Sequence, residues 1–251
     1  MLNKEYLNDD EILSDLQRDN LFILQKKSGF KFGTDAVLLS DFASEIRSDR
    51  IIDLCTGGAI VPILLFAKTS AREIYGVEIQ HESADMAKRS VLLNGIEDRV
   101  KIIESDLKKL DLEKRSFDTV TCNPPYMKIG SAIINELDEK TIARHEVLCT
   151  IDDVVRVSSE LLKNKGHLVM VHRPIRLCDV TEAMRRYDIE PKRIRFVHSK
   201  ADKPPVLFLI DGMYKGGSEL KVLPPLILQN QNGEESDEVK RIYGRNYTER
   251  F

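Results

Sequence analysis

Four consecutive residues, Asn123-Pro124-Pro125-Tyr126, join a side-chain amide, two rigid prolines and an aromatic ring. The prolines fix an extended backbone, so the Asn123 carboxamide oxygen and the Pro124 carbonyl can accept both protons of a planar amine. The ring of Tyr126 offers a face on which a planar base can stack. The tetrapeptide could be only a stiff loop. Because it directly follows the apolar run 116–122, we favour a catalytic role in transfer of a group to an amino nitrogen.

Three acidic residues occupy equivalent places after successive apolar runs. Asp53 opens the segment DLCTGGA, whose small residues let backbone amides approach a ligand. Glu78 ends the next run, where a carboxylate can accept hydrogen bonds from a ribose diol. Asp106 follows the third run and can accept a hydrogen bond from an adenine amine. Each acid alone could be an ordinary helix N-cap, but the three together predict a nucleoside cofactor.

Short apolar runs alternate with amphipathic helical stretches, which is typical of a parallel sheet covered by helices. We therefore predict an α/β fold: a Rossmann-like, doubly wound, mostly parallel seven-stranded sheet with helices on both faces and its last strand antiparallel at the sheet edge. The carboxyl ends of parallel strands share one edge, so this fold would gather the acids and the tetrapeptide. The predicted strands are 51–54, 73–78, 100–103, 116–122, 167–172, 193–198 and 206–210, and the predicted helices are 60–67, 83–93, 151–162 and 180–187.

The length of 251 residues and the 42% hydrophobic content predict a single domain with a full-sized core. We divide it into an N-terminal segment 1–49, a Rossmann-like core 50–228 and a partly flexible tail 229–251, in which 242–244 could dock back. The 38 Lys and Arg against 41 Asp and Glu give no global basic field, so a nucleic-acid partner would need a local patch.

The four cysteines lack metal-ligand spacing, so we expect no metal and no disulfide framework. The N-terminus is acidic where a signal peptide would be basic and then apolar, and no run approaches the roughly 18 apolar residues of a membrane helix. These features predict a cytoplasmic protein that does not enter a membrane. Among oligomeric states, a monomer is favoured.

These motifs resemble the class I, Rossmann-like S-adenosylmethionine-dependent methyltransferases of the small-domain group, and within it the bacterial valine-tRNA adenine-N6 methyltransferases. The segment GFKFGTDAVLL, 29–39, looks like the part of that family that precedes the first strand and helps close the pocket around the methionine end of the cofactor. The resemblance implies S-adenosyl-L-methionine as cofactor. It also implies cofactor contacts at Gly33, Thr34, Asp35, Asp53, Cys55, Gly57, Glu78, Ile79, Asp106, Leu107 and Asn123.

The glycine loop departs from the usual D-x-G-x-G-x-G pattern of these enzymes. Cys55 stands in place of the first glycine and Ala59 in place of the third, so only Gly57 is retained. A side chain at Cys55 is expected to crowd the cofactor or to require a different backbone angle, which would weaken cofactor binding.

The resemblance implies that the substrate is the N6 amine of an adenine in RNA, in a tRNA anticodon loop, flipped into the pocket beside Tyr126. Enzymes with this tetrapeptide also methylate guanine and protein glutamine, so rRNA guanine and protein glutamine remain alternatives. A non-catalytic RNA-binding protein of the same fold is a further alternative. A nicotinamide dehydrogenase would leave the tetrapeptide unexplained.

Cationic side chains after the fifth strand are the first candidates for contact with RNA phosphates. Charged clusters are often only solvated faces, which is the competing interpretation for each of them. The candidates are Arg144, His172, Arg173, Arg176, Lys192, Arg193 and Arg195.

Overall fold

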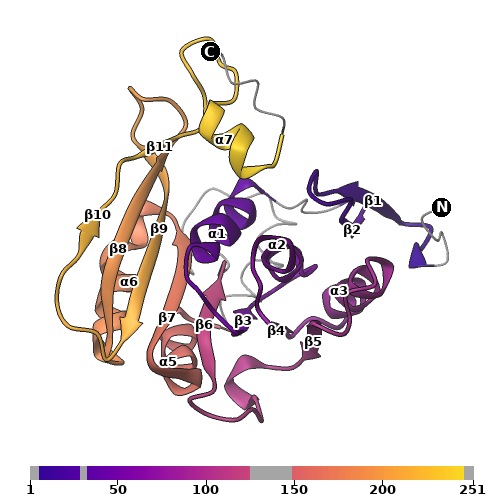
Figure 1. Ribbon diagram of the computed structural model, residues 1–251, viewed down its shortest axis with the longest axis horizontal. Coiled ribbons are helices and arrows are strands. Elements are labelled where there is room, and N and C mark those ends of the chain that lie inside the picture. Colours follow the sequence, from indigo (N-terminus) through magenta and orange to yellow (C-terminus); the bar gives the residue numbers. More distant parts are fainter. Residues whose placement is uncertain (1–5, 29–32, 125–148, 246–251) are drawn as a thin grey trace, which may run out of the picture.

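The computed structural model describes residues 6–28, 33–124 and 149–245 (Figure 1). The strands are β1 (Glu11–Asp15), β2 (Phe22–Lys26), β3 (Arg50–Leu54), β4 (Glu73–Glu78), β5 (Val100–Glu104), β6 (Phe117–Cys122), β7 (Leu162–His172), β8 (Ile189–His198), β9 (Pro205–Tyr214), β10 (Lys221–Val222) and β11 (Leu226–Ile227). The helices are α1 (Thr34–Ser44), α2 (Ile60–Lys68), α3 (His81–Leu93), α5 (Ile151–Leu161), α6 (Leu177–Arg186) and α7 (Asp237–Ile242), with 3-10 turns η2 (Leu107–Lys109) and η3 (Pro174–Arg176).

The main sheet has the order β10-β8-β9-β7-β6-β3-β4-β5, with β11 also paired to β8. All seven predicted strands are present, and β9, the last of the seven, is antiparallel to both of its neighbours. The prediction that this strand lies at the sheet edge is wrong, because β9 is inserted between β7 and β8. The chain crosses from β7 through α6 to β8, and this leaves room for one strand between β7 and β8. After the turn 199–204 the chain returns as β9, which occupies this position. The short strands β10 and β11 extend the described sheet to nine strands.

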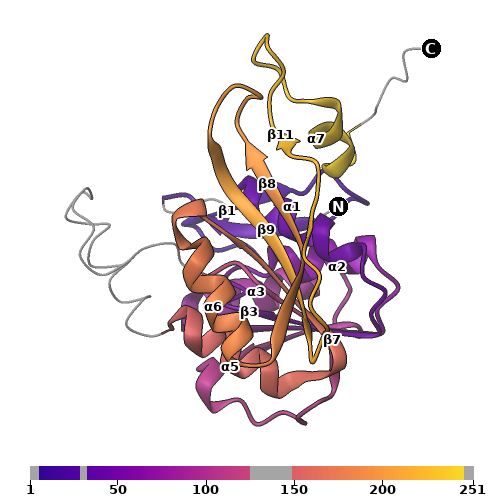
Figure 2. The ribbon, with the colours of Figure 1, turned by 90° about the vertical axis from the view of Figure 1, so that its left-hand side faces the viewer.

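Helices cover both faces of this sheet, as predicted (Figure 2). Ile51 points into the hydrophobic core shared with α1 and α2, whereas the next residue, Ile52, points into the core shared with α5 and α6. This alternation follows from the two-residue period of a strand. Because helices cover both faces of the sheet, both sets of side chains are buried and the strand is apolar along most of its length. The buried run of β3 therefore places Asp53 and the glycine loop on a rigid support.

The N-terminal segment forms a hairpin of β1 and β2 that the sequence analysis did not predict. It packs against α3, where the Asn94 amide pairs with the backbone of Phe22 (2.9 and 2.7 Å). Glu11, whose side chain is 1% exposed, accepts two hydrogen bonds from the Arg89 guanidinium at 2.7 Å. Arg89 holds the pKa of Glu11 down to about 2, so the pair is ionised and fastens the hairpin to α3.

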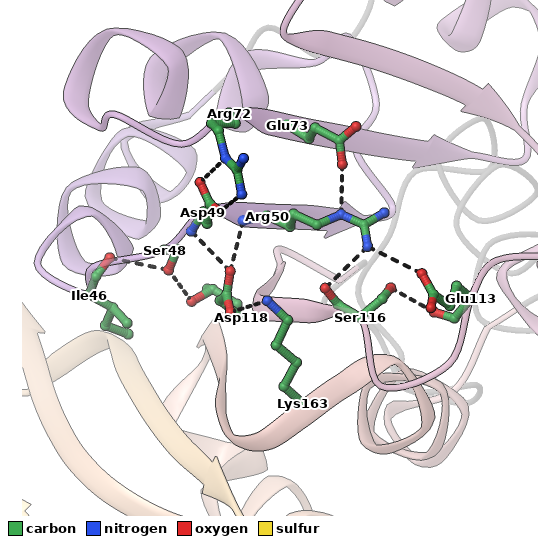
Figure 3. A network of polar contacts seen from close by, with 11 residues as sticks. Ile46, Ser48, Asp49, Arg50, Arg72, Glu73, Glu113, Ser116, Asp118 and Lys163 are labelled. Atoms are coloured by element: carbon green, nitrogen blue, oxygen red, sulfur yellow. Dashed lines mark hydrogen bonds and ion pairs between the residues drawn. The ribbon is translucent and has the colours of Figure 1, made fainter.

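The amino ends of the central strands are joined by a network of polar contacts (Figure 3). Asp118 accepts hydrogen bonds from the backbone amides of Asp49 (3.0 Å) and Arg50 (2.8 Å) and from the Lys163 ammonium (2.6 Å). Arg50 in turn pairs with Glu73 at 2.7 Å. The network ties the beginnings of β3, β4, β6 and β7 together.

The C-terminal tail docks back through α7, as predicted for Ile242, which is 4% exposed. The proposed flexibility of the early part of the tail stays a prediction. No helix in the described ranges is long and apolar enough to span a membrane.

Candidate cofactor and methyl-transfer site

The glycine loop keeps a glycine-like backbone although two of its three positions carry side chains. Cys55, Gly57 and Ala59 have φ angles of 59°, 55° and 67°, all in the left-handed region. A residue with a Cβ pays roughly 1–2 kcal/mol there. Cys55 thus adopts the same left-handed conformation as Gly57 and not a different backbone angle, and its effect on cofactor affinity stays a prediction.

Glu78 is fixed by the backbone of the loops that flank it. Its Oε2 accepts a hydrogen bond from the Gly57 amide (2.8 Å) and its Oε1 accepts one from the Gln80 amide (2.9 Å). Each carboxylate oxygen has a second lone pair, so the group can still accept hydrogen bonds from a diol. A Cβ added at Gly57 would meet nothing within 4 Å, so the loop is open on that side.

Asp53 is 2% exposed and accepts a hydrogen bond from the Thr121 hydroxyl at 2.6 Å. Burial raises the pKa of Asp53 to about 7; the hydroxyls of Thr121 and Thr56 oppose this rise, and the negative charge of Glu78 adds to it. Thr121 was not among the predicted site residues. The register of the predicted strands could have identified Thr121, because it faces Asp53 in the parallel pairing of β3 with β6.

Asp106 and its neighbours complete the row of acids. Asp106 accepts a hydrogen bond from the Lys108 amide (2.9 Å) and so caps η2, as the N-cap interpretation predicts, and its role toward a ligand stays a prediction. Leu107 is 6% exposed, whereas Ile79 is 38% exposed directly after Glu78. Since β3, β4 and β5 are parallel neighbours, the structure brings the three predicted acids to one edge of the sheet.

Asn123 and Pro124 follow β6 directly, at this same edge. Asn123 is half-buried and Pro124 is buried. Because Cys122 pairs with Leu54 in the sheet, Asn123 emerges beside the glycine loop. Pro125, Tyr126 and Arg144 lie outside the described residues.

Three cysteines lie close together beside the glycine loop: Cys55 in the loop, Cys122 at the end of β6 and Cys149 before α5. The Cys55 and Cys149 sulfurs are 3.9 Å apart. Contact with Cys122, together with burial, raises the pKa of the Cys55 thiol well above its ordinary value. The thiol is therefore neutral and presents no negative charge to a ligand.

The segment Gly33-Thr34-Asp35 begins α1 at the same edge. After α1 the chain reaches the amino edge of the sheet at Ser48, whose hydroxyl contacts the Thr119 hydroxyl at 2.7 Å. The opposite end of α1, where the helix begins, therefore lies at the carboxyl edge. A Cβ at Gly33 would lie 2.7 Å from the Asp35 carboxylate, which explains a glycine there. Asp35 is 7% exposed, and its Oδ1 accepts a hydrogen bond from the Ala36 amide (2.9 Å).

The structure corrects the prediction that His172 contacts RNA. The imidazole is completely buried, stacks on Phe208 at 6.4 Å and accepts a hydrogen bond from the Arg173 amide at 2.8 Å. Burial, with the nearby cations Arg176 and Arg173, lowers the pKa of His172 to about 4, so this side chain is neutral at pH 7. Arg173 is exposed beyond β7, and Arg176 pairs with Asp179 at 2.7 Å.

The cations of β8 are not gathered at the site. Arg193 donates to Asp211 (2.8 Å) and Glu45 (2.5 Å), and Arg195 pairs with Glu238 at 2.9 Å. Lys192 donates to the carbonyl oxygen of Gly217 at 2.9 Å. Contact of these three side chains with RNA stays a prediction, and it would require exchange of internal partners.

In the described part of the chain, no group of three or more His, Cys, Asp or Glu side chains is arranged to hold a metal ion. The candidate site thus comprises a glycine loop with a left-handed backbone, the acids Asp53 of β3, Glu78 of β4 and Asp106 after β5, and the Asn-Pro segment after β6.

Comparison with known proteins agrees with this arrangement. A tRNA1(Val) (adenine(37)-N6)-methyltransferase from Bacteroides thetaiotaomicron is 28% identical over 220 residues, covering 86% of this chain and 91% of the relative. One of the same name from Porphyromonas gingivalis is 27% identical over 189 residues, covering 72% and 73%. A crystal structure of a predicted O-methyltransferase from Agrobacterium tumefaciens superposes with a TM-score of 0.67 at 21% identity, covering 86% of this chain and all of that one, which confirms the fold. The family model of the methyltransferase small domain matches residues 27–187, and the chain belongs to that family.

Proposed function

We propose that this protein is an S-adenosylmethionine-dependent methyltransferase that acts on the N6 amine of an adenine in tRNA. The observation that carries the proposal is the position of Asn123-Pro124 after β6, at the sheet edge that also holds Asp53, Glu78 and Asp106. The names of the relatives add the finer assignment, adenine 37 of tRNA1(Val). Because tRNA is a cytoplasmic molecule, the proposal places the reaction in the cytoplasm.

The residues present fit this cofactor. Glu78 is held so that both of its oxygens can receive a ribose diol, and Gly57 leaves open space beside it. Asp106 would accept a hydrogen bond from the adenine amine, with Ile79 and Leu107 on the faces of the ring. When bound, S-adenosylmethionine supplies a methyl group on a positively charged sulfonium. The buried carboxyl of Asp53 would complement the charge at the methionine end.

The Asn-Pro segment supplies the chemistry on the substrate side. The side-chain oxygen of Asn123 and the carbonyl oxygen of Pro124 would accept the two protons of the target amine and orient its lone pair toward the methyl group. The nitrogen needs no strong base before transfer, which agrees with a site built from amides and acids. The aromatic face for the base would come from Tyr126.

The proposal predicts transfer of labelled methyl groups to an unmodified tRNA1(Val) transcript. Nucleoside mass spectrometry should find N6-methyladenosine, and a transcript with guanine at position 37 should accept none. Asn123→Ala should lower the rate by about 100-fold or more, because it removes an acceptor that positions the nucleophile. Asn232→Ala, at an exposed asparagine of the tail, is the matched control and should leave the rate unchanged.

Other outcomes would redirect the assignment. Methylated guanine in rRNA or methylated glutamine in a protein, with no transfer to tRNA, would replace the substrate class. RNA binding without any S-adenosylmethionine binding would favour the non-catalytic alternative.

A further inference from the structure

The C-terminal helix α7 packs against α1, whose first residues belong to the segment proposed to close the cofactor site. Figure 1 shows α7 directly above α1. Val239 and Ile242 of α7 are 3% and 4% exposed, and they share one hydrophobic cluster with Leu38 and Leu39 of α1. The Ser236 hydroxyl accepts a hydrogen bond from the Val239 amide (3.2 Å) and so fixes where the helix begins.

One polar contact leads from this helix to a predicted site residue. The hydroxyl of Tyr243, the residue after α7, donates a hydrogen bond to Oγ1 of Thr34 at 3.3 Å. Thr34 is the first residue of α1 and stands between Gly33 and Asp35, at the carboxyl edge of the sheet. The contact joins residues that are 209 positions apart in the sequence.

Two further contacts hold the end of α7, and with it Tyr243, close to α1. The ammonium of Lys68, whose side chain is 4% exposed, pairs with Asp41 of α1 at 2.6 Å and donates to the carbonyl oxygen of Ile242 at 3.2 Å. Burial lowers the pKa of Lys68, and the carboxylate of Asp41 opposes this effect. Lys68 therefore clamps the end of α7 to both α1 and α2.

The turn after Tyr243 is fixed on its other side. Gly244 has a φ of 73°, and the Arg18 guanidinium lies 3.4 Å from the position that a Cβ would take. The guanidinium of Arg245 stacks over the Tyr243 ring at 4.5 Å and donates to the Gln17 side chain. The ring of Tyr243 is thus held between the N-terminal hairpin turn and the start of α1.

We propose that Tyr243 is a positioning residue that holds Thr34, and with it the Gly33–Asp35 segment, in the conformation that receives the methionine end of the cofactor. This inference rests on the proposed function. A hydrogen bond that fixes a binding segment before the ligand arrives lowers the ordering cost of binding, so its loss weakens binding more than it weakens the fold. The tail then belongs to the cofactor site although it contributes no residue of the motif.

The test compares two tyrosines that each donate one hydroxyl hydrogen bond and are half-buried. Tyr243→Phe removes the bond to Thr34, and Tyr187→Phe removes the 2.5 Å bond to Asp152 on the opposite helical layer. For Tyr243→Phe we expect both the Kd for S-adenosylmethionine, measured by calorimetry, and the KM for S-adenosylmethionine to rise ~3- to 10-fold. Its kcat at saturating cofactor should stay unchanged, and Tyr187→Phe should match the wild type in all three quantities.

A double-mutant cycle with Thr34→Val tests whether the effect passes through Thr34. The two substitutions should be non-additive: Tyr243→Phe should add little once Thr34 has lost its hydroxyl. Wild-type Kd in Tyr243→Phe, or a lower melting temperature with unchanged Kd, would overturn the positioning role alone. Failure of the wild type to bind S-adenosylmethionine would overturn this inference together with the proposed function.

Discussion

The two edges of the central sheet use charge in opposite ways. At the amino edge, the Asp118 carboxylate meets an ammonium and two backbone amides, and Arg50 meets Glu73 (Figure 3). At the carboxyl edge, the hydrogen-bond partner of Asp53 is the neutral Thr121 hydroxyl, and Cys55 adopts a left-handed backbone. The first edge is arranged for stability. The second holds an uncompensated buried acid and backbone strain, which is typical of a site completed by its ligand.

The largest effect on stability is expected at the amino edge. Asp118→Ala removes three hydrogen bonds and leaves the part-buried backbone amides of Asp49 and Arg50 without this acceptor, so the free energy of unfolding should fall by about 3 kcal/mol. The melting temperature should fall by roughly 6–12 °C, measured by calorimetry at pH 7. Asp111→Ala, at an exposed aspartate, is the control and should change it little.

The pH dependence of this effect has a definite sign. Burial would raise the pKa of Asp118, but Lys163 and the amides of Arg50 and Asp49 outweigh burial and lower the pKa below 3.8. A lowered pKa in the folded state stabilises the fold above the unfolded value, and this contribution disappears as the pH falls below it. The difference between wild type and Asp118→Ala should therefore shrink below about pH 4. An equal difference at pH 7 and pH 3 would contradict the ionic account.

Asp53→Asn should act in the opposite direction at the other edge. The raised pKa of Asp53 means that the folded state binds the proton more tightly than the unfolded chain between pH 3.8 and about 7. Stability is lost as the pH rises through that window, so wild type carries a penalty at pH 8 that the neutral asparagine avoids. We expect Asp53→Asn to melt a few degrees higher at pH 8 and to bind S-adenosylmethionine at least ~10-fold more weakly.

The wild type supplies its own control for this prediction. At pH 5 the pH has crossed only about the first third of the window between 3.8 and about 7, so the difference in melting temperature should be well below its value at pH 8, and it should nearly vanish only below about pH 3.8. Cofactor affinity of the wild type should rise from pH 6 to pH 8, as binding of a cation favours the ionised carboxyl. A lower melting temperature of Asp53→Asn at pH 8 would show that the carboxylate stabilises this edge after all.

The sequence predicted those features that depend on local pattern. The apolar runs located the seven strands, and the acids after three of them fell at one edge because parallel strands share their carboxyl ends. The features it missed depend on partners far apart in the chain. Insertion of β9 is decided by pairing with both β7 and β8, and docking of the hairpin depends on Glu11 meeting Arg89, 78 positions away.

The cationic candidates show the same limit. The sequence presents Arg193 and His172 as positive charges available to RNA, but the fold places Arg193 against Asp211 and buries His172 without charge. A residue type indicates what a side chain can do, whereas its partners decide what it does. Thr121 is an intermediate case, since strand register alone would have placed it opposite Asp53.

The smallest predicted effect tests whether the strain in the glycine loop is real. Cys55→Gly and Cys55→Ala both remove the thiol, but only glycine accepts a φ of 59° without steric cost. The free energy of unfolding, measured by urea titration, should therefore be about 1 kcal/mol larger for the glycine variant than for the alanine variant.

The same pair of substitutions at Cys178, an exposed position in α6, should give the reverse order. In a helix alanine is favoured over glycine by about 0.5–1 kcal/mol, because glycine loses more conformational freedom on folding. Opposite signs at Cys55 and Cys178 would show that the carboxyl edge holds strain that an ordinary element does not. If alanine were favoured at both, the loop would relax away from the left-handed conformation, and the contrast between the two edges would depend on Asp53 alone.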